Sequence, residues 1–176
     1  MKKLAVLFAS MFIMAITVQN VSAQNEATIS NASAGATIVS SIALTNNFTL
    51  EFGEIVRSAT GGNVVITASE TPTRTPSGNL TFMPNDTWRP SKFTVTGDSG
   101  QSFKITKPGT ITLNGPSSSN MTITTSISGG TTGLITTGGS GGIGTYEFYI
   151  GGTLVVAATQ QTGTYVGTYE VTVEYE

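Results

Sequence analysis

The sequence contains no cysteine and no histidine, and only 10% of its residues are charged. It therefore lacks the Ser-His-Asp and Cys-His nucleophiles, a histidine general base, and the usual zinc, haem and iron–sulfur ligand sets. A metal ion would find only oxygen ligands, and we expect neither enzyme activity nor a cofactor. The 8 basic and 10 acidic residues form no cluster of lysine and arginine of the kind that binds nucleic acid, so we expect no nucleic-acid partner.

Small hydroxyl side chains are abundant, with 31 threonines and 18 serines beside 21 glycines. Leucine and lysine, which favour helices, are scarce, so the composition is typical of β-structure. A chain of this size can bury roughly 70% of its unfolded surface in one domain. With no cysteine to form disulfides, the stability of the protein has to come from its core.

The first residues have the pattern of a secretory signal peptide. Lys2 and Lys3 precede an apolar run over Leu4–Val18, and small residues at Val21 and Ala23 stand before Gln24. This pattern predicts a signal peptide over residues 1–23. The apolar run is shorter than the roughly 20 residues that span a bilayer, and no second run follows, so we expect no membrane span in the mature chain. The predicted location is secreted, through a periplasm to the cell surface or the extracellular space.

Apolar residues then alternate with polar ones along most of the chain. Turn signals rich in glycine and proline separate the alternating segments, and no helical stripe occurs. We therefore predict an all-β fold, an immunoglobulin-like antiparallel β-sandwich over residues 36–176, preceded by an N-terminal extension over residues 24–35. Residues 128–145 are expected to form a long loop or a loop with a hairpin. The predicted strands lie at 36–44, 48–52, 64–66, 93–95, 103–105, 111–113, 121–123, 146–150 and 165–176.

The final predicted strand has the most regular pattern. Tyr165, Gly167 and then Tyr169, Val171, Val173 and Tyr175 occupy alternate positions, with polar residues and Val166 between them. The pattern predicts that the first set is buried and the second is exposed. One interpretation is simply a long core strand. Another is that a strand with a free edge needs a partner to cover it.

The sequence from Gly163 to Glu176 resembles the C-terminal signature of chaperone–usher pilus subunits and of spore coat U-like secreted proteins. In that signature a glycine stands fourteenth from the end, apolar residues alternate, and a tyrosine is next to last; here these are Gly163, Val171 with Val173, and Tyr175. The wider pattern is similar to an uncharacterised family of secreted bacterial Gly/Thr-rich β-proteins.

The resemblance implies a pilin-like sandwich that a donor strand from a neighbouring subunit completes. It also implies assembly with itself or related subunits, and a periplasmic chaperone and usher as partners. Ala27 and Ile29, on one side of a short Ala-Thr-Ile segment, are the candidate donor residues, and a frayed tail is the alternative for the same segment. The assembly residues predicted on this basis are Ala27, Ile29, Gly163, Tyr169, Val171, Val173 and Tyr175.

Two other functions stay open at this stage. A stand-alone binding module or adhesin for glycan or matrix would use Trp88, Arg89 and the glycine-rich loop after Ser128, although a core tryptophan near the end of a strand is the simpler interpretation of Trp88. A hydrolase that works with carboxylates alone would use Glu51 and Glu54. The function that the sequence favours is a secreted structural subunit of a fimbria-like assembly that associates by β-strand addition.

Overall fold

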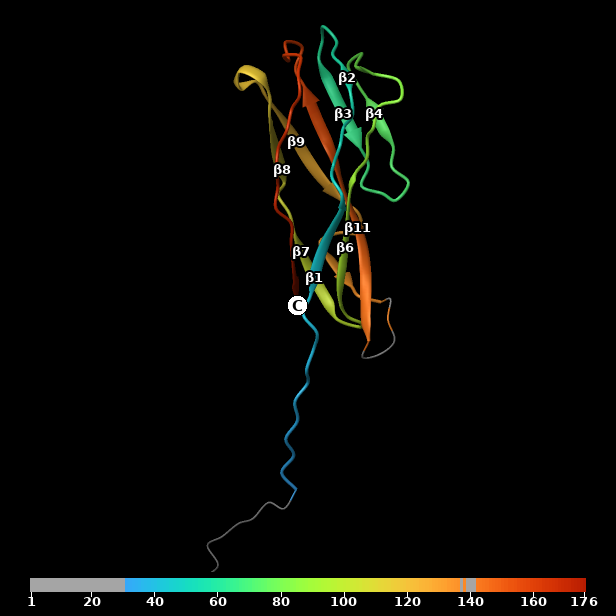
Figure 1. Ribbon diagram of the computed structural model, residues 1–176, viewed down its shortest axis with the longest axis vertical. Coiled ribbons are helices and arrows are strands. Elements are labelled where there is room, and N and C mark those ends of the chain that lie inside the picture. The colour runs from blue at the N-terminus through green and yellow to red at the C-terminus, as the bar shows by residue number, and fades with distance from the viewer. Residues whose placement is uncertain (1–30, 137, 139–141) are drawn as a thin grey trace, which may run out of the picture. The chain divides into compact units, whose positions relative to one another are not determined.

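Figure 1 shows the computed structural model, which describes residues 31–136, 138 and 142–176. These residues form antiparallel strands and one short 3-10 turn, so the prediction of an all-β sandwich is confirmed. Within them there is no helix long and apolar enough to cross a membrane. The strands are β1 (Ala43–Phe48), β2 (Ile55–Val56), β3 (Gly62–Ile66), β4 (Arg74–Pro76), β5 (Thr81–Phe82), β6 (Ser91–Asp98), β7 (Ser102–Thr106), β8 (Thr110–Asn114), β9 (Asn120–Ile127), β10 (Thr132–Leu134), β11 (Ile143–Val156) and β12 (Thr172–Tyr175).

The first layer is a sheet of seven strands built around β11. One half of β11 pairs with β6, and the other half pairs with β3. Ile150 pairs with both Ser91 of β6 and Ile127 of β9, so β9 lies on the opposite edge of β11 from β6. β1 extends the sheet beyond β6, β4 extends it beyond β3, and β8 extends it beyond β9. β11 forms this centre because its alternating side chains bury one face along its whole length.

The second layer has two separate parts. A three-stranded sheet in the order β10-β7-β12 packs against one half of the first sheet, and the short β2–β5 ladder lies at the other half. The core is divided in the same way into two groups of buried side chains. Phe93, Phe103, Phe148 and Ile150 belong to the group beside β12, whereas Leu154 belongs to the group beside β2. The sandwich is therefore well covered by strands in one half and only partly in the other.

The strand predicted from Ala36 begins later, at Ala43. Ile38, which the alternation placed in the core, is 94% exposed, whereas Ile42 and Leu44 are half-buried. The reason is pairing, because β1 takes its register from β6 starting at Ala43, and no described strand pairs with the residues before it. By its contacts the chain divides after Thr37, which leaves Ile38–Glu176 as the unit that holds the sandwich.

Two other predicted segments also differ from the structure. The stretch predicted as a strand over 48–52 leaves the β1 ladder after Phe48 and keeps a single bridge, from Glu51 to Arg89. The segment over 128–145, predicted as a long loop or a loop with a hairpin, contains β10, which pairs with β7 outside the segment, and the first residues of β11. Short edge strands such as β10 have too few residues to show a periodic pattern.

Candidate functional site

The C-terminal segment, residues 160–176, is not the single strand that its alternation predicts. Residues Thr172–Tyr175 pair with β7, and Val166 forms a bridge with Asn114 of β8. The residues between them join neither ladder. The cause is the course of the neighbouring strands β7 and β8. The Lys107–Gly109 turn between them leads from the three-stranded sheet, which contains β7, to the seven-stranded sheet, which contains β8. A strand that follows both neighbours has to leave one ladder before it meets the next.

The side chains of this segment nevertheless point as predicted. Tyr169, Val171, Val173 and Tyr175 are half-buried, and the residues that alternate with them are exposed. All four pack against the group of buried residues around Phe148. The register predicted from the sequence is therefore confirmed, although burial of this face is partial.

The hydroxyl of Tyr175 connects the C-terminal segment to two other parts of the sandwich. It accepts a hydrogen bond from the backbone N–H of Asp98 at 2.9 Å and donates one to the carbonyl of Ser40 at 3.1 Å. Gly97 leaves space for it, since a Cβ there would lie 2.3 Å from the hydroxyl oxygen. One side chain thus fixes the end of β6 and the residues just before β1.

Tyr169 lies between the two halves of the core. Its ring packs against both groups of buried residues, and its hydroxyl forms a hydrogen bond with the buried Ser91. Burial raises the pKa of the Tyr169 phenol above its ordinary value, and the hydrogen bond between the Tyr169 and Ser91 hydroxyls offsets part of that effect. The phenol is therefore held in its neutral form at ordinary pH.

Gly163 stands where the C-terminal segment turns past the 3-10 turn. Its φ is +146°, and a Cβ on it would lie 2.8 Å from the ring of Pro116. Both features favour glycine, which has no side chain to place there. The backbone conformation and the closeness of Pro116 therefore explain why a glycine stands at this signature position.

A network of hydrogen bonds joins the C-terminal segment to residues 49–57. The buried Gln160 donates from Nε2 to the hydroxyls of Tyr165 at 2.7 Å and Ser119 at 2.8 Å. The guanidinium of Arg57 donates to the carbonyl of Gln160 at 2.7 Å. The two segments are therefore tied together at this point by a side chain, and no backbone hydrogen bond joins them within the described residues.

Beside this tie the two segments enclose a groove of about 930 Å³. Residues 49–57 line one side and residues 160–167 line the other; we call these its two rims. Apolar side chains of the core lie between the rims and form its floor. The floor residues are Leu113, Met121, Ile123, Leu154 and Val156.

The 49–57 rim is held in place by a buried ion pair. The side chains of Arg74 and Asp86 are only 6% and 5% exposed and are joined by hydrogen bonds of 2.6 and 2.8 Å. Arg74 also donates to the carbonyl of Phe52, and Asp86 accepts from the N–H of Glu54. The hydrogen bond from Arg74 lowers the pKa of Asp86 below its ordinary value, with the Glu54 N–H acting in the same direction and burial acting against both. This pair fixes the turn at Gly53, where φ is +75°.

The sequence reasoning missed this ion pair. Arg74 and Asp86 lie in turn-rich stretches that have no periodic pattern, and neither stands beside the other in the sequence. The available signal was the scarcity of charge, because a chain with so few charged residues seldom leaves an arginine and an aspartate in its irregular loops without partners.

The residues considered for other functions have structural partners. Glu51 pairs with Arg89 at 2.8 Å, and this pair is partly exposed. Glu54 donates its backbone N–H to Asp86, and among the described residues its carboxylate forms no ion pair. Trp88 is half-buried against the core, with the guanidinium of Arg74 5.3 Å from its ring centre. The structure therefore engages Glu51 in an ion pair and packs Trp88 partly into the core.

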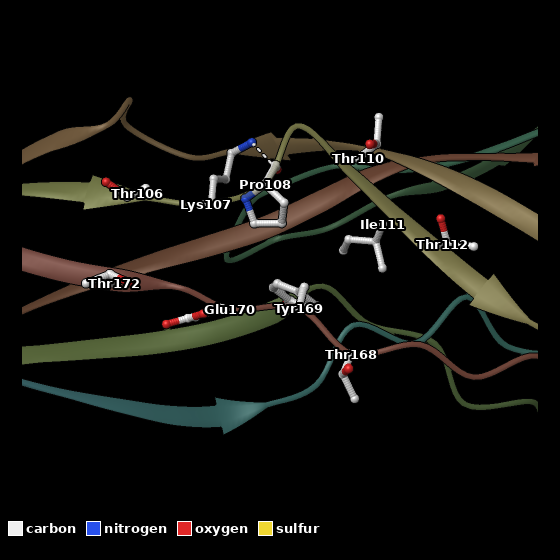
Figure 2. Close-up of a pocket in the computed structure, with 10 residues that line it drawn as sticks. All are labelled: Thr106, Lys107, Pro108, Thr110, Ile111, Thr112, Thr168, Tyr169, Glu170 and Thr172. Atoms are coloured by element: carbon white, nitrogen blue, oxygen red, sulfur yellow. Dashed lines mark hydrogen bonds between the residues drawn. The ribbon is translucent and has the colours of Figure 1, made fainter.

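A second, smaller hollow of about 480 Å³ lies where the C-terminal segment leaves the ladders. Figure 2 shows that its walls come from the β7–β8 turn and from residues Thr168–Thr172, with Lys107 turned toward Pro108. Lys107 is engaged, because its ammonium donates to the hydroxyl of Thr125 at 2.7 Å. Half of its lining residues are threonines, and the exposed Glu170, which forms none of the ion pairs among the described residues, also lies on its wall.

The remaining predicted residues, Ala27 and Ile29, lie outside the described residues, as does the predicted signal peptide over residues 1–23. Their predicted roles stay predictions.

Comparison with known proteins gives a family but no activity. No curated protein matches the chain, and no solved structure matches it. A family described as "Domain of unknown function (DUF4402)" matches residues 42–175, from the residue before β1 to the end of β12. The match takes in both rims of the groove and all of its floor. The chain belongs to this family of domains of unknown function, DUF4402.

Proposed function

We propose that this protein is an exported structural subunit of a cell-surface filament, and that its copies associate by β-strand addition into the groove. The observation that carries the proposal is that apolar core side chains form the floor of a groove whose two rims share no backbone hydrogen bond within the described residues and are tied only by the Arg57 side chain. In a complete sandwich a strand covers such side chains. Here the place of that strand is free to be taken by another chain.

The hydrogen bonds of the rims support the same function. Each rim already uses one edge, because Val166 bonds to Asn114, and Ile55–Val56 pair with β5. A strand has two edges, and unsatisfied backbone groups in an apolar setting are costly. An added strand would bond to the second edges of both rims and cover the floor at the same time.

The resemblance to pilus subunits agrees with this arrangement. Of its signature residues, Gly163 lies on one rim, and the others follow further along the same C-terminal segment; two of the signature residues have demanding local roles. Gly163 makes the turn against Pro116, and Tyr175 fastens the far end to Ser40 and Asp98. The predicted signal peptide adds export, which a surface filament requires.

The experiment compares two aspartate substitutions on β8. Leu113 is half-buried on the floor of the groove, and its neighbour Thr112 is exposed on the other face of the strand. We expect Leu113→Asp to abolish assembly because it places a charge where the added strand must pack, whereas Thr112→Asp should assemble like the wild type. The readouts are size-exclusion chromatography with light scattering and electron microscopy of the full chain.

Circular dichroism and urea unfolding of both variants separate loss of assembly from loss of folding. A folded Leu113→Asp chain that assembles as well as the wild type would contradict the proposal. So would a wild-type chain that stays monomeric at every concentration, and a stand-alone binding module would then be the better interpretation.

A further inference from the structure

The segment from Ala32 to Ile38 has the pattern of a strand but pairs with no strand that the structure describes. Its even positions are all apolar, and its odd positions are Ser33, Gly35 and Thr37. Every residue in it is exposed, and Ile38 is 94% exposed. A one-sided apolar alternation of this kind is typical of a strand that packs one face on a core. The even residues are Ala32, Ala34, Ala36 and Ile38.

We infer that Ala32–Ile38 of a second copy of this chain is the strand that fills the groove, with these four apolar side chains against its floor. This inference rests on the proposed function and names the occupant of that site. Three properties of the segment point to it: its charge, its side-chain sizes and its reach.

The segment suits the groove in charge and in size. No charged residue occurs between Glu26 and Glu51, so the strand would bring no charge into the apolar site. The floor is made of large side chains, Leu113, Met121 and Leu154 among them. Small side chains pack well opposite large ones, which suits a strand of three alanines with one isoleucine.

The alternation also decides between this segment and the earlier Ala-Thr-Ile copy. Ala27 and Ile29 stand at odd positions, whereas Ala36 and Ile38 stand at even ones. Because side chains alternate between faces, one continuous strand cannot present Ile29 and Ile38 to the same floor. The donor strand therefore presents either its odd or its even positions to the floor. Only the even positions carry four apolar residues in succession.

The connection between Ile38 and β1 is too short for Ile38 to enter the groove of its own copy. Fewer residues separate Ile38 from Ala43 than separate Ala43 from Thr49, where the rim begins. A chain that reversed before β1 would also use at least two residues in the turn. Ile38 would then stop beside β1, short of the groove, and the Tyr175 hydrogen bond to Ser40 would be broken. For the groove of a second copy, the short connection to β1 is no limit, and the hydrogen bond between Tyr175 and Ser40 can stay in place.

The test uses aspartate substitutions in the full chain, expressed with its leader and purified. We expect Ile38→Asp to be monomeric at concentrations where the wild type assembles, with a loss of at least tenfold in apparent association. Thr37→Asp, on the other face of the same segment, should assemble like the wild type, and so should Ile29→Asp. Light scattering after size exclusion measures all four proteins.

A second arm measures binding directly. A fluorescent peptide of residues 31–42 should bind the monomeric Ile38→Asp chain, whereas the same peptide carrying Ile38→Asp should bind at least tenfold more weakly. Adding Leu113→Asp to the chain should weaken binding of the unchanged peptide by a similar factor. Fluorescence anisotropy gives each dissociation constant.

The outcomes separate this inference from the proposed function. If Ile29→Asp abolishes assembly and Ile38→Asp does not, the donor is the other segment, and strand addition stands. If Ile38→Asp assembles and Leu113→Asp does not, the groove is used by a different strand. If neither substitution affects assembly and the peptide does not bind, both the inference and the proposed function are wrong.

Discussion

A single hydroxyl group at Tyr175 satisfies two backbone groups that belong to different segments. It accepts from the N–H of Asp98 and donates to the carbonyl of Ser40. The ring meanwhile packs on the core beside β12. At the scale of the residue, this explains why a tyrosine rather than another aromatic suits this position, since phenylalanine would fill the same space without either bond.

Replacing Tyr175 by phenylalanine should lower the free energy of unfolding by about 1–2 kcal/mol, because two hydrogen bonds are lost and the Asp98 N–H is left without its partner. Urea unfolding followed by circular dichroism measures the change. Equal free energies for Tyr175→Phe and wild type would show that the hydroxyl does not stabilise the fold.

A double-mutant cycle with Gly97 provides the control. A Cβ at Gly97 would lie 2.3 Å from the Tyr175 hydroxyl oxygen, so Gly97→Ala should be destabilising in the wild type. It should cost less in the Tyr175→Phe background, where that oxygen is gone, although Ile135 at 2.9 Å keeps part of the penalty. If the effects of Gly97→Ala and Tyr175→Phe on the free energy of unfolding are additive, the contact between these two residues is contradicted.

At the scale of the element, the 49–57 rim depends on a pair of side chains that belong to neither rim. Arg74 and Asp86 hold the Phe52–Glu54 backbone from the side of β4. Arg74 also stacks on Phe82, with its guanidinium carbon 3.6 Å from the ring centre. The ion pair therefore joins the rim to β4 and to the stretch over 77–90 that contains β5, and it supports one wall of the groove.

Lowering the pH should destabilise the 49–57 rim, because it protonates Asp86. Because the pKa of Asp86 is lowered in the folded chain, the stability it adds is complete above the unfolded value of about 4 and is lost as the pH falls through the folded value. We expect Asp86→Asn to be less stable than wild type at pH 7 and to lose less stability between pH 4 and pH 2. Urea unfolding across this range measures both curves.

Asp98→Asn is the matched control, because the Asp98 carboxylate forms none of the ion pairs among the described residues. Its pH dependence should follow that of the wild type. Parallel curves for Asp86→Asn and wild type would show that the Arg74 pair does not lower the pKa of Asp86.

The longer strands could be predicted from the sequence, and the short ones could not. β3, β6, β7, β8 and β9 bury one face through period-two alternation, which the sequence displays directly. β4 and β5 are too short for a period, and their places depend on partners distant in the sequence. Alternation also failed at Ile38, because a one-sided pattern predicts a strand without saying whether its partner is in the same chain.

The candidate site, too, could be predicted from the sequence only in part. The face of Tyr169, Val171, Val173 and Tyr175 follows from local alternation and was predicted correctly. The groove itself was not predictable, because its rims, residues 49–57 and 160–167, lie far apart in the sequence and the Arg74 pair holds one of them in place. Both causes are tertiary, and neither leaves a periodic signal.

At the scale of the whole molecule, the two halves of the sandwich differ in how they are covered. The half beside β12 has a three-stranded sheet over its core, whereas the half beside β2 has a two-stranded ladder and the groove. Ile123, Leu154 and Val156 on the floor are already buried, whereas Leu113 and Met121 are half-buried and leave part of their apolar surface in water, which lowers their contribution to stability. A strand that enters the groove should therefore stabilise the folded chain as well as link it to its neighbour.

This gives a prediction for the unfolding of the whole domain. A peptide of residues 31–42 should stabilise the Ile38→Asp chain, by about 2.7 kcal/mol when its concentration is one hundred times its dissociation constant, because it binds the folded state alone. The assembled wild type, whose grooves are already occupied, should gain far less from the same peptide. Urea unfolding at increasing peptide concentration measures the effect, and the peptide carrying Ile38→Asp is the control. Equal stabilisation by both peptides would mean that they bind somewhere other than the groove floor.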